Sequence, residues 1–334
     1  MSKKDKVRIV EPDATTPEEE QKKLNESLQT TELNTPETLD SFSEKIEANR
    51  KEFYKAYSNQ RRLSNILIPV VGVLMAGSLI LFIGIKEQWA KILGGVIIGV
   101  TLVGMIVYFI LTRNKLPNKS KEYISNFVTV SDNYVFNDQE YSNQKVFIKK
   151  RFAISDFLPD RVYKDIVDLA SRNIVEFTYK DHVVTVGEAA LYKAGAKRGQ
   201  KALLFVGKYM SFTNDFHFEG RYIINIRGKD DTDFPNDVDD LVALKEQNRF
   251  VIYGKDGANP EKDLGKKLIN NLMSIDCKNS LLNVNIVIWA GHTAIYLSYD
   301  DGVIAIPLDK DLNTAAYQQL KKNIKDLVSI LIEK

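Results

Sequence analysis

The chain has very few of the residues that build metal and redox sites. Among its 334 residues there is one cysteine, Cys277, and there are three histidines, His182, His217 and His292. A single cysteine excludes an internal disulfide framework and any cysteine-rich metal site. The histidines lie far apart, and none begins the HExxH pattern that places two zinc ligands on one helix face. From the sequence we therefore assign no catalytic residue, no metal ligand and no cofactor.

The chain also lacks an excess of charge of either sign. Lys and Arg total 46 against 44 Asp and Glu, which gives a formal net charge of +2. Binding to nucleic-acid phosphates needs a concentrated basic face. A nucleic-acid partner is therefore not expected.

Charge is missing altogether from two stretches. Residues 63–85 form a run of 23 uncharged residues, and residues 92–112 form another of 21. At about 1.5 Å per residue, a helix of either length crosses a hydrocarbon core of about 30 Å. Helices in soluble cores seldom stay apolar on every face for so long. We therefore predict a transmembrane hairpin of two helices, 63–85 and 92–112, joined by an external turn at 86–91.

The flanking charges predict the orientation of this hairpin. Basic residues precede the first span and follow the second: Lys51, Lys55, Arg61, Arg62, Arg113, Lys115, Lys119 and Lys121. The turn holds only Lys86 and Lys91. The positive-inside rule then places both termini in the cytoplasm, with Trp89 at the opposite interface, where amphipathic rings are common.

Small residues in the spans predict how helices pack there. Gly95 and Gly99 form a GxxxG pair, and Gly72 and Ala76 form a second small pair four residues apart. Such spacings let helix backbones approach closely. We expect the two spans to pack at these residues. A glycine-lined pore made by several subunits is the alternative, but neither span carries an ionisable residue that would support transport.

The segment before the hairpin divides into two parts. Residues 1–35 have few large apolar groups and predict a disordered cytoplasmic tail. Residues 36–62 predict an amphipathic cytoplasmic helix, which Asp40 or Ser41 could cap. Its apolar stripe comprises Leu39, Phe42, Ile46, Phe53 and Tyr57. The stripe either docks on the C-terminal domain or forms a short coiled coil.

Residues 121–334 predict a cytoplasmic α+β domain, because strand and helix patterns alternate irregularly. Apolar spacing predicts helices at 162–169, 264–272 and 312–331. Strand patterns occur at 174–179, 183–191, 202–209, 222–226, 284–289, 293–299 and 303–307.

Two charged loops are candidate binding sites. The first is basic and contains Lys193, Lys197, Arg198 and Lys201. It is either an exposed hairpin tip or a contact with anionic lipid headgroups. The second is acidic and contains Asp230, Asp231, Asp233, Asp237, Asp239 and Asp240. It is either a solvated loop leading into a helix or an oxygen-rich site for a hard cation.

A series of short motifs links the chain to a known family. Phe157-Leu158-Pro159 is followed by the runs at 183–188, 204–207, 216–220, 250–253 and 303–306. With the preceding hairpin, residues 123–334 resemble a family of bacterial membrane proteins catalogued only as a domain of unknown function, number thirty-one thirty-seven. The resemblance implies a bacterial plasma membrane protein and carries no reaction or catalytic residues.

These observations favour a membrane-anchored interaction or scaffold module, with the lipid bilayer and either a protein or a second copy of the chain as partners. One alternative is a membrane-anchored, metal-dependent hydrolase that uses Asp300, Asp301 or the acidic loop. A glycine-lined oligomeric channel is the other.

Overall fold

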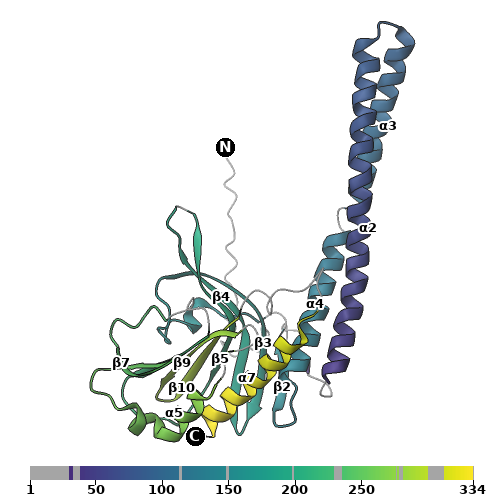
Figure 1. Cartoon of the computed structure of the whole chain (residues 1–334). Coiled ribbons are helices and arrows are strands. Elements are labelled where there is room, and N and C mark those ends of the chain that lie inside the picture. Colours follow the sequence, from purple (N-terminus) through teal and green to yellow (C-terminus); the bar gives the residue numbers. More distant parts are fainter. Residues whose placement is uncertain are drawn as a thin grey trace, which may run out of the picture.

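The computed structural model describes residues 30–32, 38–112, 115–147, 150–197, 199–228, 235–275, 277, 281–299 and 312–333. A long pair of apolar helices rises from a domain built on an antiparallel sheet with helices packed on it (Figure 1). The predicted α+β class is therefore confirmed. The predicted tail, except for residues 30–32, and the predicted strand at 303–307 lie outside the described residues.

The helix pair continues into the domain at its base. Helix α2 spans Leu39–Leu79 and ends in a π-helical turn, η1, at Ile80–Gly84. Helix α3, Gln88–Thr112, returns along it, and α4, Lys115–Phe136, follows after a break. The cap of α2 is Thr38, whose hydroxyl accepts a hydrogen bond from the Ser41 amide over 3.2 Å, so the cap predicted at Asp40 or Ser41 was wrong.

Within the described residues, ten strands form a single sheet. The strands are β1 Thr30–Glu32, β2 Ser142–Phe147, β3 Ile166–Tyr179, β4 His182–Ala194, β5 Lys201–Phe212, β6 Arg221–Arg227, β7 Val242–Gln247, β8 Phe250–Gly254, β9 Leu281–Trp289 and β10 His292–Tyr299. Their order is β1-β2-β3-β4-β5-β10-β9-β6-β8-β7, and every neighbouring pair is antiparallel. The middle of the sheet therefore pairs strands that are far apart in sequence, β5 with β10 and β9 with β6.

Short helices and one long helix complete the domain. They are η2 Ile154–Asp156, η3 Glu261–Gly265, α5 Lys266–Met273 and α7 Thr314–Ile332. Helices α5 and α7 confirm the predicted helices at 264–272 and 312–331. Helix α7 is capped by Asn313, whose side chain accepts a hydrogen bond from the Ala316 amide over 3.2 Å.

The helix predicted at 162–169 was wrong. Strand β3 begins at Ile166, and it pairs with β4 along its whole length, from Ile166 opposite Lys193 to Tyr179 opposite His182. Arg161 and Asp165 have φ values of +49° and +58°, and a right-handed helix cannot contain such residues. The predicted join of β3 and β4 is confirmed, because Lys180 and Asp181 form a two-residue turn with φ of +45° and +69°.

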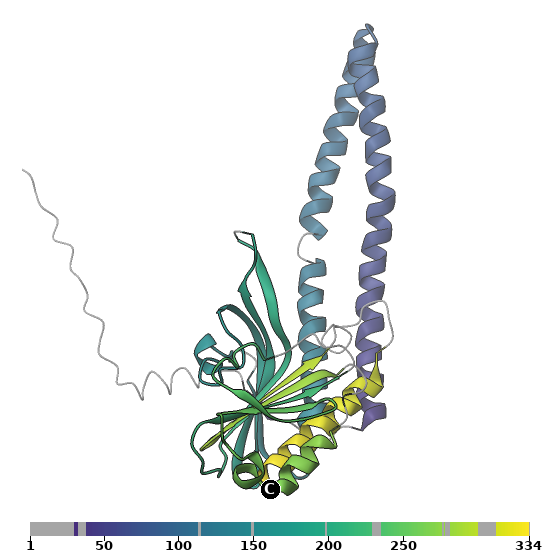
Figure 2. The same ribbon diagram turned by 60° about the vertical axis from the view of Figure 1, so that its left-hand side comes forward.

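The sheet has a hydrophobic core on each face. On one face, residues of α2, α4, α5 and α7 share a single core, and Figure 2 shows α5 and α7 lying along this side. Phe42 of α2 is fully buried there, stacked on Tyr134 of α4 at 4.6 Å and tilted against Tyr317 of α7 at 5.3 Å. The apolar stripe of α2 therefore docks on the domain. The opposite face is covered by the loop before β3, through Phe152 and Phe157.

Candidate functional site

The outer surface of the helix pair is apolar. Large side chains such as Val73, Ile83 and Val100 are 72%, 75% and 68% exposed. Only 6% of the residues in the most apolar 18-residue stretch of each helix are buried within the chain. Both helices are long and apolar enough to cross a membrane, and their apolar stretches are not buried within the described chain.

The two helices come into backbone contact at a glycine that the sequence reasoning did not select. A Cβ atom added at Gly94 would lie 2.7 Å from the carbonyl oxygen of Ser78 and 3.0 Å from the amide nitrogen of Phe82. At the other end of the apolar region, the hydroxyls of Ser64 and Tyr108 are 3.1 Å apart and share a hydrogen bond. Gly94 therefore sets the helix separation near the turn.

The four predicted packing residues have a different environment. No atom lies within 4 Å of a Cβ built at Gly72 or Gly99, and a Cβ at Gly95 comes no nearer than 3.8 Å to the ring of Phe82. Ala76 is exposed. Within a single chain, the close contact between the spans falls at Gly94 and not at the four predicted residues. Gly72, Ala76 and Gly99 face outward.

The predicted boundary residues lie at opposite ends of the apolar region. Arg61 and Arg62 are exposed on α2, just before its first uncharged residue. Trp89 is 61% exposed at the start of α3, beside the α2–α3 turn, which is the end of the hairpin farthest from the sheet (Figure 1). Arg113 and the side chain of Lys115 lie outside the described residues.

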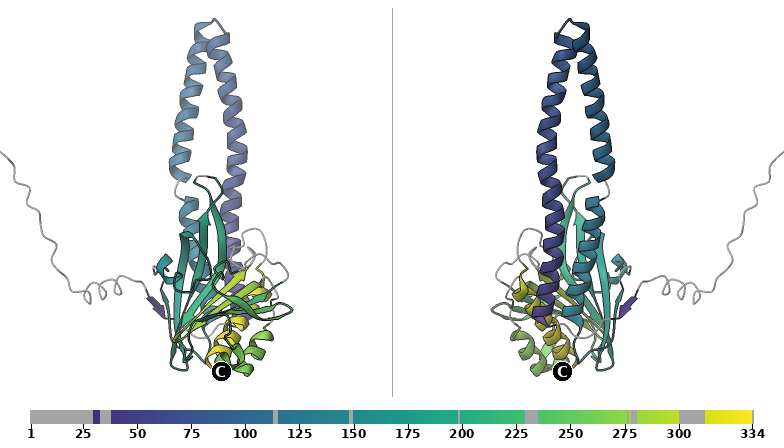
Figure 3. Two further views of the ribbon diagram at one scale, coloured as in Figure 1. Left: turned by 90° about the vertical axis from the view of Figure 1, so that its left-hand side faces the viewer. Right: turned by 90° about the vertical axis from the view of Figure 1, so that its right-hand side faces the viewer.

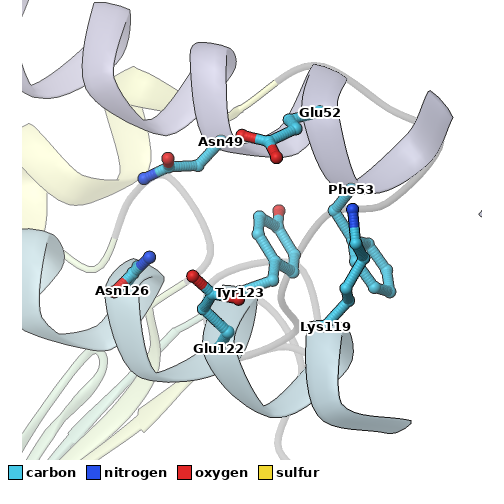
Figure 4. Close-up of a pocket in the computed structure, with 7 residues that line it drawn as sticks. All are labelled: Asn49, Glu52, Phe53, Lys119, Glu122, Tyr123 and Asn126. Carbon is cyan, nitrogen blue, oxygen red and sulfur yellow. The ribbon is translucent and has the colours of Figure 1, made fainter. Parts of the chain in front are cut away.

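A small cavity of about 50 Å³ lies between α2 and α4 (Figure 4). Figure 4 shows Asn49, Glu52 and Phe53 on one helix facing Lys119, Glu122, Tyr123 and Asn126 on the other. The rings of Phe53 and Tyr123 stack with their centres 5.0 Å apart, and burial raises the pKa of Tyr123 to about 12. A cavity of this size holds one or a few water molecules, so the contact is a joint between helices rather than a ligand site.

A buried group of charges joins α4 to the sheet. Lys208 of β5 lies 3.2 Å from Glu188 of β4 and 3.6 Å from Asp132 of α4, and Arg172 of β3 donates to Glu188. Burial raises the pKa of Asp132 to about 6, although Lys208 opposes this shift. Burial also disfavours the charge on Lys208, yet Glu188 and Asp132 together hold its pKa above the ordinary value. These groups fix α4 electrostatically on the sheet.

On the other face of the sheet, a fully buried carboxylate lies under the loop before β3. The hydroxyls of Tyr209 and Tyr296 donate to Oδ2 of Asp160 over 3.0 and 2.6 Å. Oδ1 of Asp160 has no hydrogen-bond partner in the described part of the chain, and Nε2 of His292 is 3.5 Å from it. Burial, followed by the nearby Asp160, raises the pKa of both tyrosines, so they remain donors to the carboxylate over the physiological range.

The acidic loop does not gather into a cation site where it is described. Asp237 pairs with Arg161 and Lys164, Asp239 with Lys164, and Asp240 with Arg161 and Arg221. No group of three His, Cys, Asp or Glu side chains suited to a metal ion occurs among the described residues. Asp230, Asp231, Asp233, Asp300 and Asp301 lie outside them.

The basic loop is the tip of the β4–β5 hairpin. Lys193 and Lys197 are exposed, Lys201 lies 2.6 Å from Asp168, and Arg198 is outside the described residues. The hairpin extends from the sheet in the same direction as the helix pair. Figures 1, 2 and 3 differ only by rotation about the vertical axis, and in each the hairpin tip reaches the height of the break between α3 and α4.

Sequence reasoning missed two parts of this arrangement. Helix α4 carries a recognisable signal, because Tyr123, Phe127, Ser131, Tyr134 and Val135 recur at helical spacing and all are buried. The cluster at Asp160 carries none, because its members come from a loop and from strands β5 and β10.

No protein-family model, curated protein or solved structure matches the chain, and the resemblance to the family of unknown function stays a prediction.

Proposed function

We propose that the chain spans a bacterial plasma membrane twice, with both termini in the cytoplasm, and holds its α+β domain at the inner surface as an interaction or scaffold module. The observation that carries this proposal is the apolar outer surface of α2 and α3. Exposing side chains such as Val73 and Ile83 to water costs about 25 cal/mol for each Å² of apolar surface. A bilayer removes that cost.

The joint at the base supports the scaffold part of the proposal. Phe42 and Ile46 of α2 are fully buried in the domain core, and the stack of Phe53 on Tyr123 links α2 to α4. Lys208 then ties α4 to the sheet. An anchor joined through this much buried surface holds the domain in one orientation, as a scaffold requires.

A groove on the described domain surface is suited to a partner. It has a volume of about 600 Å³ and is lined by Pro159, Arg161, Gly220, Arg221, Asp240, Leu241, Lys255 and Trp289. Strand register places Trp289 between Arg221 and His292, and the ring of Trp289 stacks on His292 at 4.3 Å. An aromatic ring beside arginine and lysine is typical of interaction hot spots. The groove is our candidate for the partner surface.

The anchor is tested by placing charges on its outer surface. Val73→Asp and Ile80→Asp together add about 5–7 kcal/mol to insertion of the first span. Both side chains are well exposed, at 72% and 65%, so the fold of the domain should not change. We expect the full chain to remain with membranes through alkaline carbonate extraction and the double variant to be released. Leu158→Asp with Val183→Asp, at comparably exposed positions in the domain, is the matched control and should stay in the membrane fraction.

The interaction role is tested by comparing what copurifies with the chain from detergent-solubilised membranes. A specific partner, or a second copy of the chain, should be retained by the natural chain and lost from Trp289→Ala with Lys255→Glu. Equal recovery of the partner by the natural chain and by the double variant would show that the groove is not the partner surface. No partner at all would contradict the scaffold function.

A second candidate, an oligomeric channel, is favoured by one observation. Gly72 and Gly99 have open space beside them within the chain and are free to contact another subunit. A channel predicts conductance in planar bilayers that is lost in Gly99→Leu.

A further inference from the structure

A groove of about 620 Å³ runs along α2 directly below its uncharged segment. It is lined by Tyr54, Tyr57, Ser58, Asn59, Arg61, Arg62 and Asn65. Six of these seven residues recur at steps of one, three or four residues and share one helix face. Along α2, the groove lies between the stack of Phe53 on Tyr123 and the hydrogen bond of Ser64 with Tyr108, the two places where α2 is tied to the returning chain.

The groove is strongly cationic. Arg61 and Arg62 are exposed, and within the described part of the chain no carboxylate pairs with either guanidinium. The sequence contains no Asp or Glu from Phe53 to Ile85 or from Gln88 to Lys121. Two adjacent guanidiniums without local anions form a site for a phosphate group, which arginine binds through paired hydrogen bonds.

The surface above the groove is apolar. Ile68 and Val73 follow the arginines on the same side of α2 and are 69% and 72% exposed. An anion-binding groove that continues into an apolar helix surface matches a ligand with an anionic head and an apolar tail. A free inorganic anion would use only the lower half of it.

We infer that this groove binds the headgroup of an anionic phospholipid. The inference rests on the proposed membrane insertion, which places Arg61 and Arg62 at the depth of the lipid phosphates. The guanidiniums bind the phosphate, and the Tyr57 hydroxyl and the Asn59 and Asn65 amides provide hydrogen bonds to the polar headgroup. The acyl chains lie along Ile68 and Val73. The basic tip of the β4–β5 hairpin, at a similar height, adds long-range attraction for the same lipids.

The experiment uses the full chain purified in a zwitterionic detergent. Native mass spectrometry measures retention of phosphatidylglycerol, with phosphatidylcholine and inorganic phosphate as the other probes. We expect phosphatidylglycerol to bind about 10- to 30-fold more tightly than phosphatidylcholine. Arg61→Gln with Arg62→Gln should abolish this preference. Lys86→Gln with Lys91→Gln, which removes two cations at the opposite end of the hairpin, should leave it unchanged.

Equal preference in the two double variants would overturn the inference, because the attraction would then be a property of overall charge. Displacement of the lipid by millimolar phosphate would assign the site to a free anion instead and would also overturn it. Carbonate extraction of the natural chain separates this inference from the proposed function. Release of the natural chain contradicts insertion itself, whereas retention without a lipid preference contradicts only the headgroup site.

Discussion

Asp160 shows how a single residue can hold a loop on a sheet. The carboxylate of Asp160, in the loop before β3, is fully buried and accepts hydrogen bonds from the hydroxyls of Tyr209 and Tyr296, while Arg221 of β6 donates to the Asp160 carbonyl. A buried carboxylate costs several kcal/mol unless it is paired and hydrogen-bonded. The two tyrosines and the nearby His292 offset that cost.

We predict that Asp160→Asn lowers the free energy of unfolding by about 1–3 kcal/mol, because the amide cannot accept both hydroxyls as strongly and adds a buried donor. In a Trp89→Phe background, Trp289 is the remaining tryptophan and stacks beside the cluster on His292, so its fluorescence reports unfolding in detergent. Asp256→Asn, at an exposed site on the same domain, should change stability by less than about 0.5 kcal/mol. Equal effects of the two variants would mean that the cluster does not hold the loop.

Asp132 gives the stability a specific pH dependence. Its pKa rises from an ordinary value of 3.8 to about 6 in the folded chain, mainly through burial. The folded state therefore holds this proton over a pH range in which the unfolded state releases it, and the stabilisation is lost as pH rises from about 4 to about 6.

The Asp132→Asn variant should not lose this stabilisation as the pH rises, because its side chain does not titrate. Relative to the natural chain, the variant should gain up to about 3 kcal/mol between pH 4 and pH 6 and change little above that range. Denaturant unfolding of both proteins across this range measures the difference. A difference that stays constant with pH would show that Asp132 titrates normally and that the buried charge cluster is more hydrated than its geometry indicates.

At the scale of elements, the sequence predicts those parts of the fold whose pattern is local. The β3–β4 turn, the helix α7 and the apolar helices have spacings that a single element explains, and each was found. Helix α4 has an equally local pattern that was overlooked. The prediction of a helix at 162–169 was wrong for a non-local reason. Four apolar residues happen to have helical spacing there, but from Ile166 onward the chain pairs with β4, and this pairing outweighs the local pattern.

Sites were less predictable than elements. The contact at Gly94 depends on where two helices cross, and the pairing of Lys208 with Asp132 joins residues from a strand and a helix that are far apart in sequence. Neither follows from spacing along one segment. The basic loop could be identified from sequence because its charges lie within nine residues of one another. Its position relative to the helices could be seen only in the fold.

The helix crossing gives a prediction with an internal control. Gly94→Val should lower hairpin stability in detergent by about 1–3 kcal/mol, because the new side chain collides with the backbone of Ser78 and Phe82. Gly99→Val has open space and should have little effect on the same measurement. If Gly99→Val were the more disruptive substitution in the isolated chain, the helix crossing described above would be wrong.

At the scale of the whole molecule, three features fit the proposed position of the bilayer. The apolar outer surface of α2 and α3 ends at Arg62, unpaired cations gather there, and the tip of the β4–β5 hairpin reaches the height at which α3 ends. In the proposed topology, the domain lies beside the cytoplasmic ends of the helices, with its sheet joined to them through α4. This arrangement suits a module whose position relative to the membrane surface matters.

The central claim is that the helix pair spans the membrane with the domain inside the cell. It is tested most directly by cysteine labelling of intact bacteria in a Cys277→Ser background, with a membrane-impermeant maleimide. Trp89→Cys, beside the α2–α3 turn, should label without permeabilisation. Asp181→Cys, at the exposed β3–β4 turn, should label only after permeabilisation. Labelling of Asp181→Cys in intact cells, or protection of Trp89→Cys until the membrane is opened, would contradict the account.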